Sequence, residues 1–167
     1  KNKFIISNVT LRLTKKNHKI KSEYSDLKNH LIDNGINSPT IKNIAESVSK
    51  IRANKLPNYK KIGNAGSFFK NPIIDSLKFK TIKKLYPNII SYGVGKSRFK
   101  IPAGWLIEQC GFKDIKKKKV SVYKKQALVI INLGDAKGID IFNFSQKIKK
   151  TVNEKFDILL EEEVNII

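Results

Sequence analysis

The residues best suited to chemistry lie together in one stretch, Gly63–Pro72, which reads Gly-Asn-Ala-Gly-Ser-Phe-Phe-Lys-Asn-Pro. Its two glycines allow a positive φ angle or a close approach of a ligand to the backbone. The hydroxyl group of Ser67 follows them directly. This combination is typical of a turn that faces a ligand. An ordinary glycine turn leading into a buried strand accounts for the same residues, and the stretch taken alone favours that second interpretation.

The thiol and imidazole groups do not form the pattern of a metal site. Cys110 is the only cysteine, which excludes an internal disulfide and a Cys-x-x-Cys site. It follows the apolar residues 105–107, so a buried thiol is expected. His18 and His30 have no cysteine or histidine at ligand spacing. We therefore expect no bound metal.

The formal net charge of +20 raises the possibility of a polyanionic partner such as nucleic acid. Only three of the 34 Lys and Arg residues are arginine, however. Proteins that recognise bases or phosphates geometrically favour the bidentate arginine side chain. Lysine is abundant together with Ile and Asn, and the codons of all three are rich in A and T. Genome composition therefore explains the charge best, weak anion binding comes second, and no specific nucleic-acid partner is predicted.

Length and composition indicate a globular protein. The chain has 167 residues, 40% of them hydrophobic and well spread along the sequence. No apolar run has the length needed to cross a bilayer, and no signal peptide is recognisable. Methionine is absent even at position 1, which suggests a piece of a longer protein. We expect no membrane partner and a cytoplasmic location.

The first part of the chain is expected to contain one strand and two helices. The predicted segments are a half-buried strand over 4–13, a loop over 14–22, and helices over 24–33 and 39–53. Ser38 and Pro39 fit the N-cap and first position of the second helix. Apolar residues from Ile41 to Ile51 recur in it at helical spacing. Because a lone strand is unstable, we expect 4–13 to pair with a sheet outside this sequence.

From residue 65 onward, strands and helices alternate, which predicts an α+β or α/β domain. The expected segments are a linker over 57–64, a strand over 65–70, a helix over 73–85, a loop over 88–100, a helix over 103–110, a solvated turn at 116–119, strands over 120–124 and 127–132, a helix over 138–155 and an acidic strand over 157–167. The apolar run Ala127–Ile131 is typical of a central strand.

Several of these segments occur in an order that resembles one known family. The segments are Lys55-Leu56-Pro57, the stretch 63–72, the Ala103–Gly111 block (Ala-Gly-Trp-Leu-Ile-Glu-Gln-Cys-Gly), Gln126–Val129 and Leu160–Val164. Together they resemble the C-terminal half of the UDP-N-acetylenolpyruvoylglucosamine reductase (MurB) family. The resemblance runs over the whole chain and implies an α+β fold. It also implies a flavin-binding half upstream, without which the chain is not expected to be active.

The resemblance implies a reductase that uses FAD and NADPH. NADPH reduces FAD, and the flavin passes hydride to the enolpyruvyl ether of a UDP-sugar. The resulting enolate is then protonated, which gives the lactyl ether of UDP-N-acetylmuramate, a peptidoglycan precursor. Such chemistry needs donors that stabilise the enolate and one positioned acid.

Ser67 matches the proton donor of the family, and Glu163 matches its catalytic glutamate. A carboxyl group at position 163 would help to stabilise the enolate. The alternative for the run Glu161–Glu163 is a solvent-facing acidic end. Strand alternation would place Glu161 and Glu163 on one face and Glu162 on the other. In the family an arginine from the upstream half completes this group.

Other matching positions are implied to bind substrate or cofactor. Lys55 and Asn71 match positions that hold the diphosphate, since a point charge and an amide suit phosphate oxygens. The remaining substrate positions are Tyr24, which closes over the nucleotide, and Tyr92, Lys113 and Gln126. Arg52 and Gly66 match positions near FAD. For each lysine, a solvated surface charge is the alternative.

The implied domains are the end of an FAD-binding domain over 1–57, a substrate-binding domain over 58–160, and a terminal strand over 161–167 that returns to the FAD-binding part. The chain departs from the family pattern at Asp114 and at Lys116–Lys119, where the family has glycine and small residues. The second hypothesis is a basic module that binds anions or nucleic acid without catalysis. It would bind any polyanion with strong salt dependence.

Overall fold

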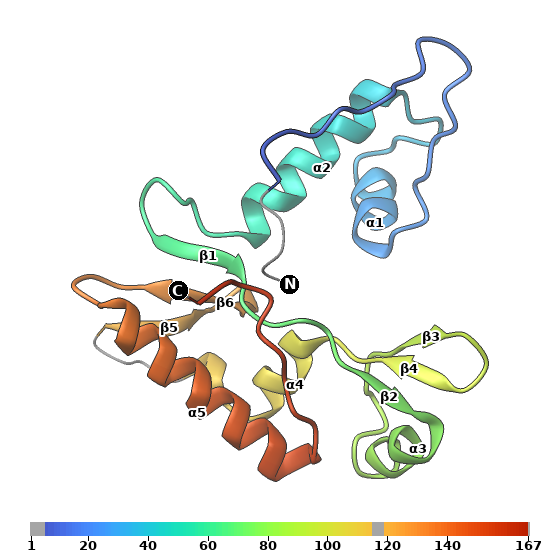
Figure 1. Cartoon of the computed structure of the whole chain (residues 1–167). Helices are drawn as coiled ribbons and strands as arrows, with labels where there is room; N and C mark the ends of the chain where they lie inside the picture. The colour runs from blue at the N-terminus through green and yellow to red at the C-terminus, as the bar shows by residue number, and fades with distance from the viewer. Residues whose placement is uncertain (1–5, 115–118, 167) are drawn as a thin grey trace. The chain divides into compact units, whose positions relative to one another are not determined.

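The computed structural model describes residues 6–114 and 119–166. Backbone contacts divide the chain into two units, Lys1–Arg52 and Ala53–Ile167, which we describe separately (Figure 1). The described residues are a mixture of helices and antiparallel sheets, which confirms the α+β class. No helix within them is long and apolar enough to cross a membrane.

The first unit contains α1 (Ser25–Asp33) and most of α2 (Ile41–Lys55). Both helices were predicted, but the predicted cap of α2 at Ser38 is wrong. The helix begins two residues later because Thr40 and Asn43 hydrogen-bond reciprocally. The Thr40 backbone N–H donates to Asn43 Oδ1 (2.9 Å), and the Asn43 backbone N–H donates to Thr40 Oγ1 (3.2 Å). This is the arrangement of a capping box, with asparagine in the place of glutamate.

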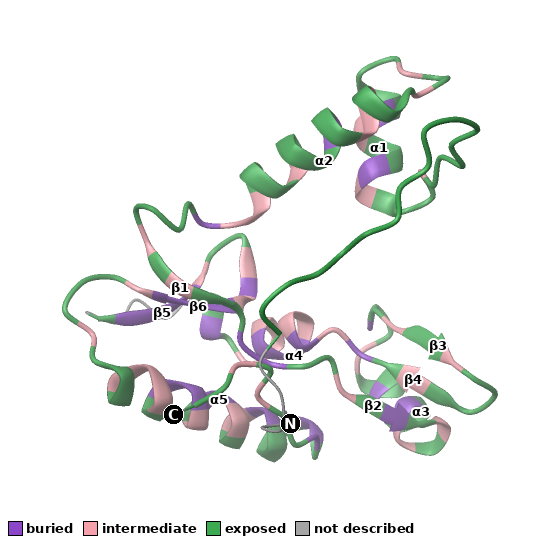
Figure 2. Ribbon diagram, turned by 45° about the horizontal axis from the view of Figure 1, so that its top comes forward, coloured by how far each residue is buried: buried purple, intermediate pink, exposed green. Residues whose placement is uncertain are grey.

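The predicted strand over 4–13 is wrong for its described part. Residues 6–13 contain no strand, and apolar side chains such as Ile6 and Leu13 are each 80% exposed (Figure 2). Alternating apolar residues do not make a strand unless a second strand completes the hydrogen bonds, and the described residues of this unit offer none. The loop predicted over 14–22 is confirmed.

The second unit is built on a sheet of β1 (Gly63–Ser67), β5 (Val120–Tyr123) and β6 (Gln126–Asn132) in the order β1-β6-β5. All neighbours are antiparallel. The apolar run in β6 was predicted to be central, and it is. Ala127, Val129, Ile130 and Ile131 are buried in it.

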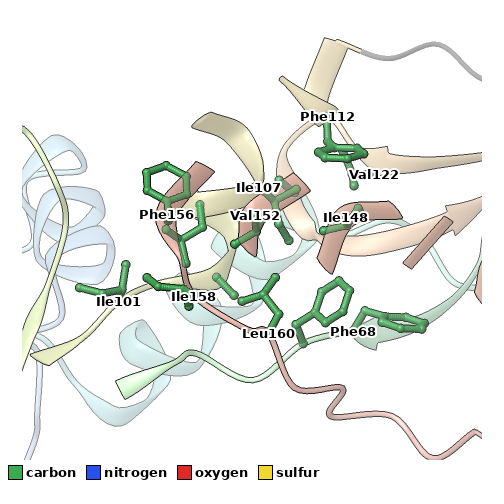
Figure 3. Close-up of a cluster of buried hydrophobic side chains, with 14 of the residues drawn as sticks. Phe68, Ile101, Ile107, Phe112, Val122, Ile148, Val152, Phe156, Ile158 and Leu160 are labelled. Carbon is green, nitrogen blue, oxygen red and sulfur yellow. The ribbon is translucent and has the colours of Figure 1, made fainter. Parts of the chain in front are cut away.

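Helices α4 (Ala103–Gln109) and α5 (Gly138–Phe156) pack on this sheet and carry the core, as their apolar spacing predicts. A short 3₁₀ helix, η1 (Phe112–Asp114), follows α4. The side chains of Phe144, Ile148 and Val152 in α5 are buried, and Ile148 and Val152 lie among the labelled core residues of Figure 3. Cys110 ends α4 and is half-buried. Burial raises the pKa of its thiol, although the nearby charge of Lys155 lowers it.

A second sheet, in the order β2-β4-β3, consists of β2 (Ile73–Asp75), β3 (Tyr92–Val94) and β4 (Arg98–Lys100). The helix predicted over 73–85 is shorter, because residues 73–75 form β2 and α3 spans Ser76–Leu85. Asp75 caps α3 by accepting a hydrogen bond from the Lys78 backbone N–H (2.8 Å). The loop predicted over 88–100 is wrong, since β3 and β4 form a hairpin there. Phe99 stacks on Phe79 of α3 (ring centroids 4.1 Å apart).

The acidic strand predicted over 157–167 is also largely wrong. Asp157 takes a left-handed conformation at the end of α5, and the chain then runs back with Ile158 and Leu160 buried. It makes an isolated antiparallel bridge between Glu162 and Phe69. The predicted turn over 116–119 lies outside the described residues except for Lys119, which is exposed.

Candidate functional site

The central feature of the second unit is the pairing of the chain just after β1 with the acidic segment near the C-terminus. The Glu163 backbone N–H donates to the Phe68 carbonyl (2.9 Å), and the Lys70 backbone N–H donates to the Glu161 carbonyl (2.9 Å). Ser67 directly precedes the residue that bonds Glu163. Two residues far apart in the sequence are thus held at neighbouring backbone positions.

The other side of the same stretch is held by β6. The Phe68 backbone N–H donates to the Leu128 carbonyl (2.9 Å), and Ser67 is in register with Val129. Phe69 is fully buried, and its ring meets the ring of Phe68 edge-on with centroids 5.1 Å apart. The stretch 67–70 therefore lies between β6 and the terminal segment, anchored by two aromatic side chains.

The side chains of Ser67 and Glu163 are both exposed. Strict strand alternation would place them on opposite faces of the pairing. The alternation is interrupted here, however. Phe68 and Phe69 are consecutive and both buried, the β1–β6 register shifts between Asn64 and Ser67, and the chain bends at Glu163.

Gly66 sets up this irregular backbone. Its φ is +73°, and its N–H donates to Asn64 Oδ1 (3.0 Å). A Cβ atom added at this position would meet no atom within 4 Å. Conformation rather than crowding therefore requires glycine here.

The terminal acidic run places its carboxylates in different surroundings. Glu161 forms an ion pair with Lys70, with both side chains largely exposed. Glu162 turns toward α5, where its Oε1 accepts hydrogen bonds from Lys149 Nζ (2.8 Å) and Gln146 Nε2 (3.0 Å). The side chains of Lys149 and Glu162 are only 20% and 18% exposed. The opposite directions of Glu161 and Glu162 agree with the alternation expected from the sequence.

Asn71 contacts the start of α4, and Gln126 is the first residue of β6. Asn71 Oδ1 accepts a hydrogen bond from the Ala103 backbone N–H (2.8 Å) and so caps α4 from a distant part of the chain. Gln126 Oε1 would lie 3.1 Å from a Cβ atom added to Gly104, which places Gln126 against the same helix. Together with Ser67 and Glu163, these residues belong to adjoining segments of one region.

The other predicted positions belong to other elements of the chain. Tyr92 is exposed on β3. Lys113 pairs with Glu108 at the end of α4 (Nζ–Oε1 2.9 Å). Lys55 is half-buried as the last residue of α2. Tyr24 and Arg52 are exposed residues of the first unit.

Sequence reasoning overlooked two features. Lys100 is in register with Tyr92 across the hairpin, so its side chain lies beside that ring on the same face of the sheet. The glycine-containing turn between Tyr92 and Lys100 was the signal for a hairpin. The second feature, the anchoring of Glu162 on α5, had no signal, because Lys149 belongs to a separate element.

The region around Ser67 does not coincide with a hollow found elsewhere in the second unit. That hollow, of about 490 Å³, lies at the start of β1 and the end of β6. None of the predicted site residues lines it. Its lining residues are Lys61, Ile62, Gly63, Asn132, Leu133, Gly134 and Asp135.

Replacing Gly66 tests its backbone conformation. We expect Gly66→Ala to lower the free energy of unfolding by about 1–2 kcal/mol in urea denaturation, because a left-handed conformation costs an L-residue roughly that much. Gly93→Ala is the matched control, since Gly93 also has open space around it but no positive φ. Equal losses in both variants would contradict the assignment.

The Glu162 ion pair predicts a specific pH dependence. Burial raises the pKa of the Glu162 carboxyl group, but the hydrogen bonds from Lys149 and Gln146 and the charge of Lys149 outweigh it, so the pKa lies below its ordinary value of 4.5. The stabilisation is therefore complete above the unfolded-state pKa and is lost as the pH falls through the folded-state pKa. We expect the stability advantage of the unsubstituted chain over Glu162→Gln to shrink between about pH 5 and pH 3.

Thermal or urea denaturation over this pH range checks the expectation. Glu154→Gln is the control, because Glu154 pairs with Lys150 on the exposed side of α5 (3.8 Å) and such pairs contribute little. If the stability difference between the unsubstituted chain and Glu162→Gln does not change with pH, the charge of the Glu162 carboxylate does not stabilise the fold, which would contradict the prediction.

Comparison with known proteins agrees with this architecture. Residues 56–167 match the family model described as UDP-N-acetylenolpyruvoylglucosamine reductase, C-terminal domain. The chain is 47% identical over all its 167 residues to the protein of that name from Flavobacterium johnsoniae, covering 50% of the relative. It is 43% identical over its whole length to the Amoebophilus asiaticus protein, covering 49% of it. The Porphyromonas gingivalis protein is 45% identical over 130 residues, 78% of this chain and 38% of the relative.

The chain thus spans about half the length of the curated relatives that it matches from end to end. The matched range begins at Leu56, directly after α2, and includes the glycine turn, both sheets and the acidic segment. On this match, the chain belongs to the UDP-N-acetylenolpyruvoylglucosamine reductase family.

Proposed function

We propose that this chain supplies the substrate-binding surface and the proton-transfer groups of a reductase that converts UDP-N-acetylenolpyruvoylglucosamine to UDP-N-acetylmuramate, in peptidoglycan precursor synthesis. The observation that carries the proposal is the backbone pairing at Phe68 and Glu163, which joins two segments matched by the family. The reductase would work in the cytoplasm, with NADPH as the reductant and FAD as the resident cofactor. Bound FAD would supply the hydride.

In this proposal Ser67 donates the proton. A serine hydroxyl is a weak acid, so it acts only when it is held against the enolate carbon and its alkoxide is stabilised. The constrained backbone supports that role, because Gly66 turns the chain immediately before Ser67 and β6 fixes it immediately after. In its protonated form, Glu163 would stabilise the negative charge that develops on the substrate carboxylate.

Substrate binding would use groups near this stretch. The Nδ2 group of Asn71 would donate to the diphosphate, while its oxygen caps α4. Gln126, Lys55 and Lys113 would provide further polar and charged contacts, and Tyr92 with Tyr24 would lie against the nucleotide. Arg52 and Gly66 would adjoin the flavin.

We also propose that residues 1–57 belong with the flavin-binding part and residues 58–160 form the substrate-binding domain, with 161–167 returning toward the flavin. The division of the contacts at Arg52 and the start of the family match at Leu56 support a boundary in this region.

A chimera tests the function. In it, this chain replaces the matched half of the Flavobacterium johnsoniae reductase, to which it is 47% identical. We expect the chimera to bind FAD and to oxidise NADPH with multiple turnovers only when UDP-N-acetylenolpyruvoylglucosamine is added, since without it the reaction stops once the flavin is reduced. The intact relative is the positive control. A chimera with a normal flavin spectrum that never reacts with the substrate would contradict the proposal. Equal, salt-sensitive binding of the chain to any polyanion would instead favour the basic-module hypothesis.

Ser67→Ala in the same chimera tests the proton donor. NADPH should reduce the flavin at the normal rate, while substrate should reoxidise it about 10²–10⁴-fold more slowly, the usual contribution of a general acid. Stopped-flow absorbance separates the two half-reactions. Ser49→Ala, on the exposed surface of α2, should change neither. Normal reoxidation in Ser67→Ala would remove Ser67 from this role.

A further inference from the structure

We propose that Glu162, held by Lys149 and Gln146 of α5, is a positioning residue that keeps Glu163 paired with the Ser67 strand. We call these three side chains the α5 clamp. The inference rests on the proposed function, because positioning matters only if Glu163 acts in the reaction.

The terminal segment needs such a clamp because its backbone pairing is short. Among the described residues, two backbone hydrogen bonds join it to residues 68–70, and Glu162 forms an isolated bridge with Phe69. Two-strand contacts of this length are marginally stable in water. Buried side chains hold the chain up to Leu160, and the partly buried Val164 packs against the same core, so the clamp acts on the three residues between these two anchors.

The contacts within the α5 clamp are of a strong kind. Both hydrogen-bond donors reach the same atom, Glu162 Oε1, from one face of α5. Gln146 and Lys149 are three residues apart and therefore lie on the same side of the helix. The ion pair is largely shielded from solvent, and charge-assisted hydrogen bonds in such surroundings are stronger than exposed pairs. α5 itself is fixed in the core by Ile148 and Val152.

The clamp also fixes the backbone that leads into Glu163. Glu162 is turned toward α5, and the side chain of Glu163, at the bend that follows directly, is exposed. Releasing Glu162 would let the segment rotate or separate, and small misplacements of a reacting group have large effects on rate.

The exposed Lys70–Glu161 pair provides a matched control within the same segment. This ion pair joins the terminal segment to residues 68–70, and its glutamate directly precedes Glu162. Its side chains, however, are 44% and 63% exposed. Exposed pairs contribute little. A substitution there removes the same charge without releasing the clamp.

The first measurement needs no catalysis. Amide hydrogen exchange in the 167-residue chain, followed at Glu163, reports whether its N–H stays bonded to Phe68. We expect Glu162→Ala and Lys149→Ala to speed this exchange about tenfold and Glu161→Ala to change it less than about twofold. The charge-reversed pair, Glu162→Lys with Lys149→Glu, should restore slow exchange. Unchanged exchange in Glu162→Ala, or no restoration by the reversed pair, would overturn the clamp.

The second measurement uses the chimera. Glu162→Ala should lower kcat about tenfold with KM changed less than about twofold, because the clamp orients a catalytic group without touching substrate. The reversed pair should recover most of kcat. Faster exchange with an unchanged kcat would show that the clamp is structural only and overturn the positioning role. An inactive unsubstituted chimera would contradict the proposed function, whereas the exchange data decide the clamp whatever the chimera does.

Discussion

Two backbone hydrogen bonds, from Glu163 to Phe68 and from Lys70 to Glu161, join the end of the chain to the stretch that follows β1. Without them Ser67 and Glu163 would belong to unrelated parts of the surface. The sheet β1-β6-β5, the two buried phenylalanines and the packing of α5 all serve to bring these strands of backbone to the same place. The proposed chemistry depends on this pairing, because an acid and a charge-stabilising carboxyl group must share one region of the surface.

Although the chain has a net charge of +20, individual charges in it form specific ion pairs. The run Glu161–Glu163 looks like a solvated acidic end, yet two of its carboxylates have lysine partners in opposite directions. Lys70 holds Glu161 at the surface, and Lys149 holds Glu162 against α5. Genome composition could explain why lysine is abundant in this chain, but at these two positions a lysine forms a specific ion pair with a glutamate. The same excess is why a lysine such as Lys113, paired with Glu108, is weak support for a site on its own.

Much of the fold could be predicted wherever one element carries its own apolar pattern. α5, α4, β5 and β6 lie where their spacing places them, since each buries a continuous stripe or run. The hairpin of β3 and β4 was missed because its strands are only three residues long and rich in glycine and basic side chains. Residues 6–13 show the opposite failure: their alternation is clear, but the described residues of the first unit provide no partner strand.

The candidate site followed from the order of its motifs and not from local pattern. Ser67, Asn71, Gln126 and Glu163 lie in adjoining segments, but their roles remain proposals. Contacts between separate elements could not be foreseen, and these include the cap that Asn71 forms on α4 and the bond between Glu162 and Lys149. In each contact, the type and sequence position of one residue give no indication of its partner.

The pairing itself can be measured most directly by nuclear magnetic resonance on the 167-residue chain. Phe69 and Glu162 form an antiparallel bridge flanked by hydrogen bonds on either side, a geometry that brings the two Cα atoms to about 4.5 Å. We expect a strong nuclear Overhauser effect between the Hα protons of Phe69 and Glu162. Assigned resonances for both residues with no such effect would show that the terminal segment does not pair with the Ser67 stretch, and would contradict the account.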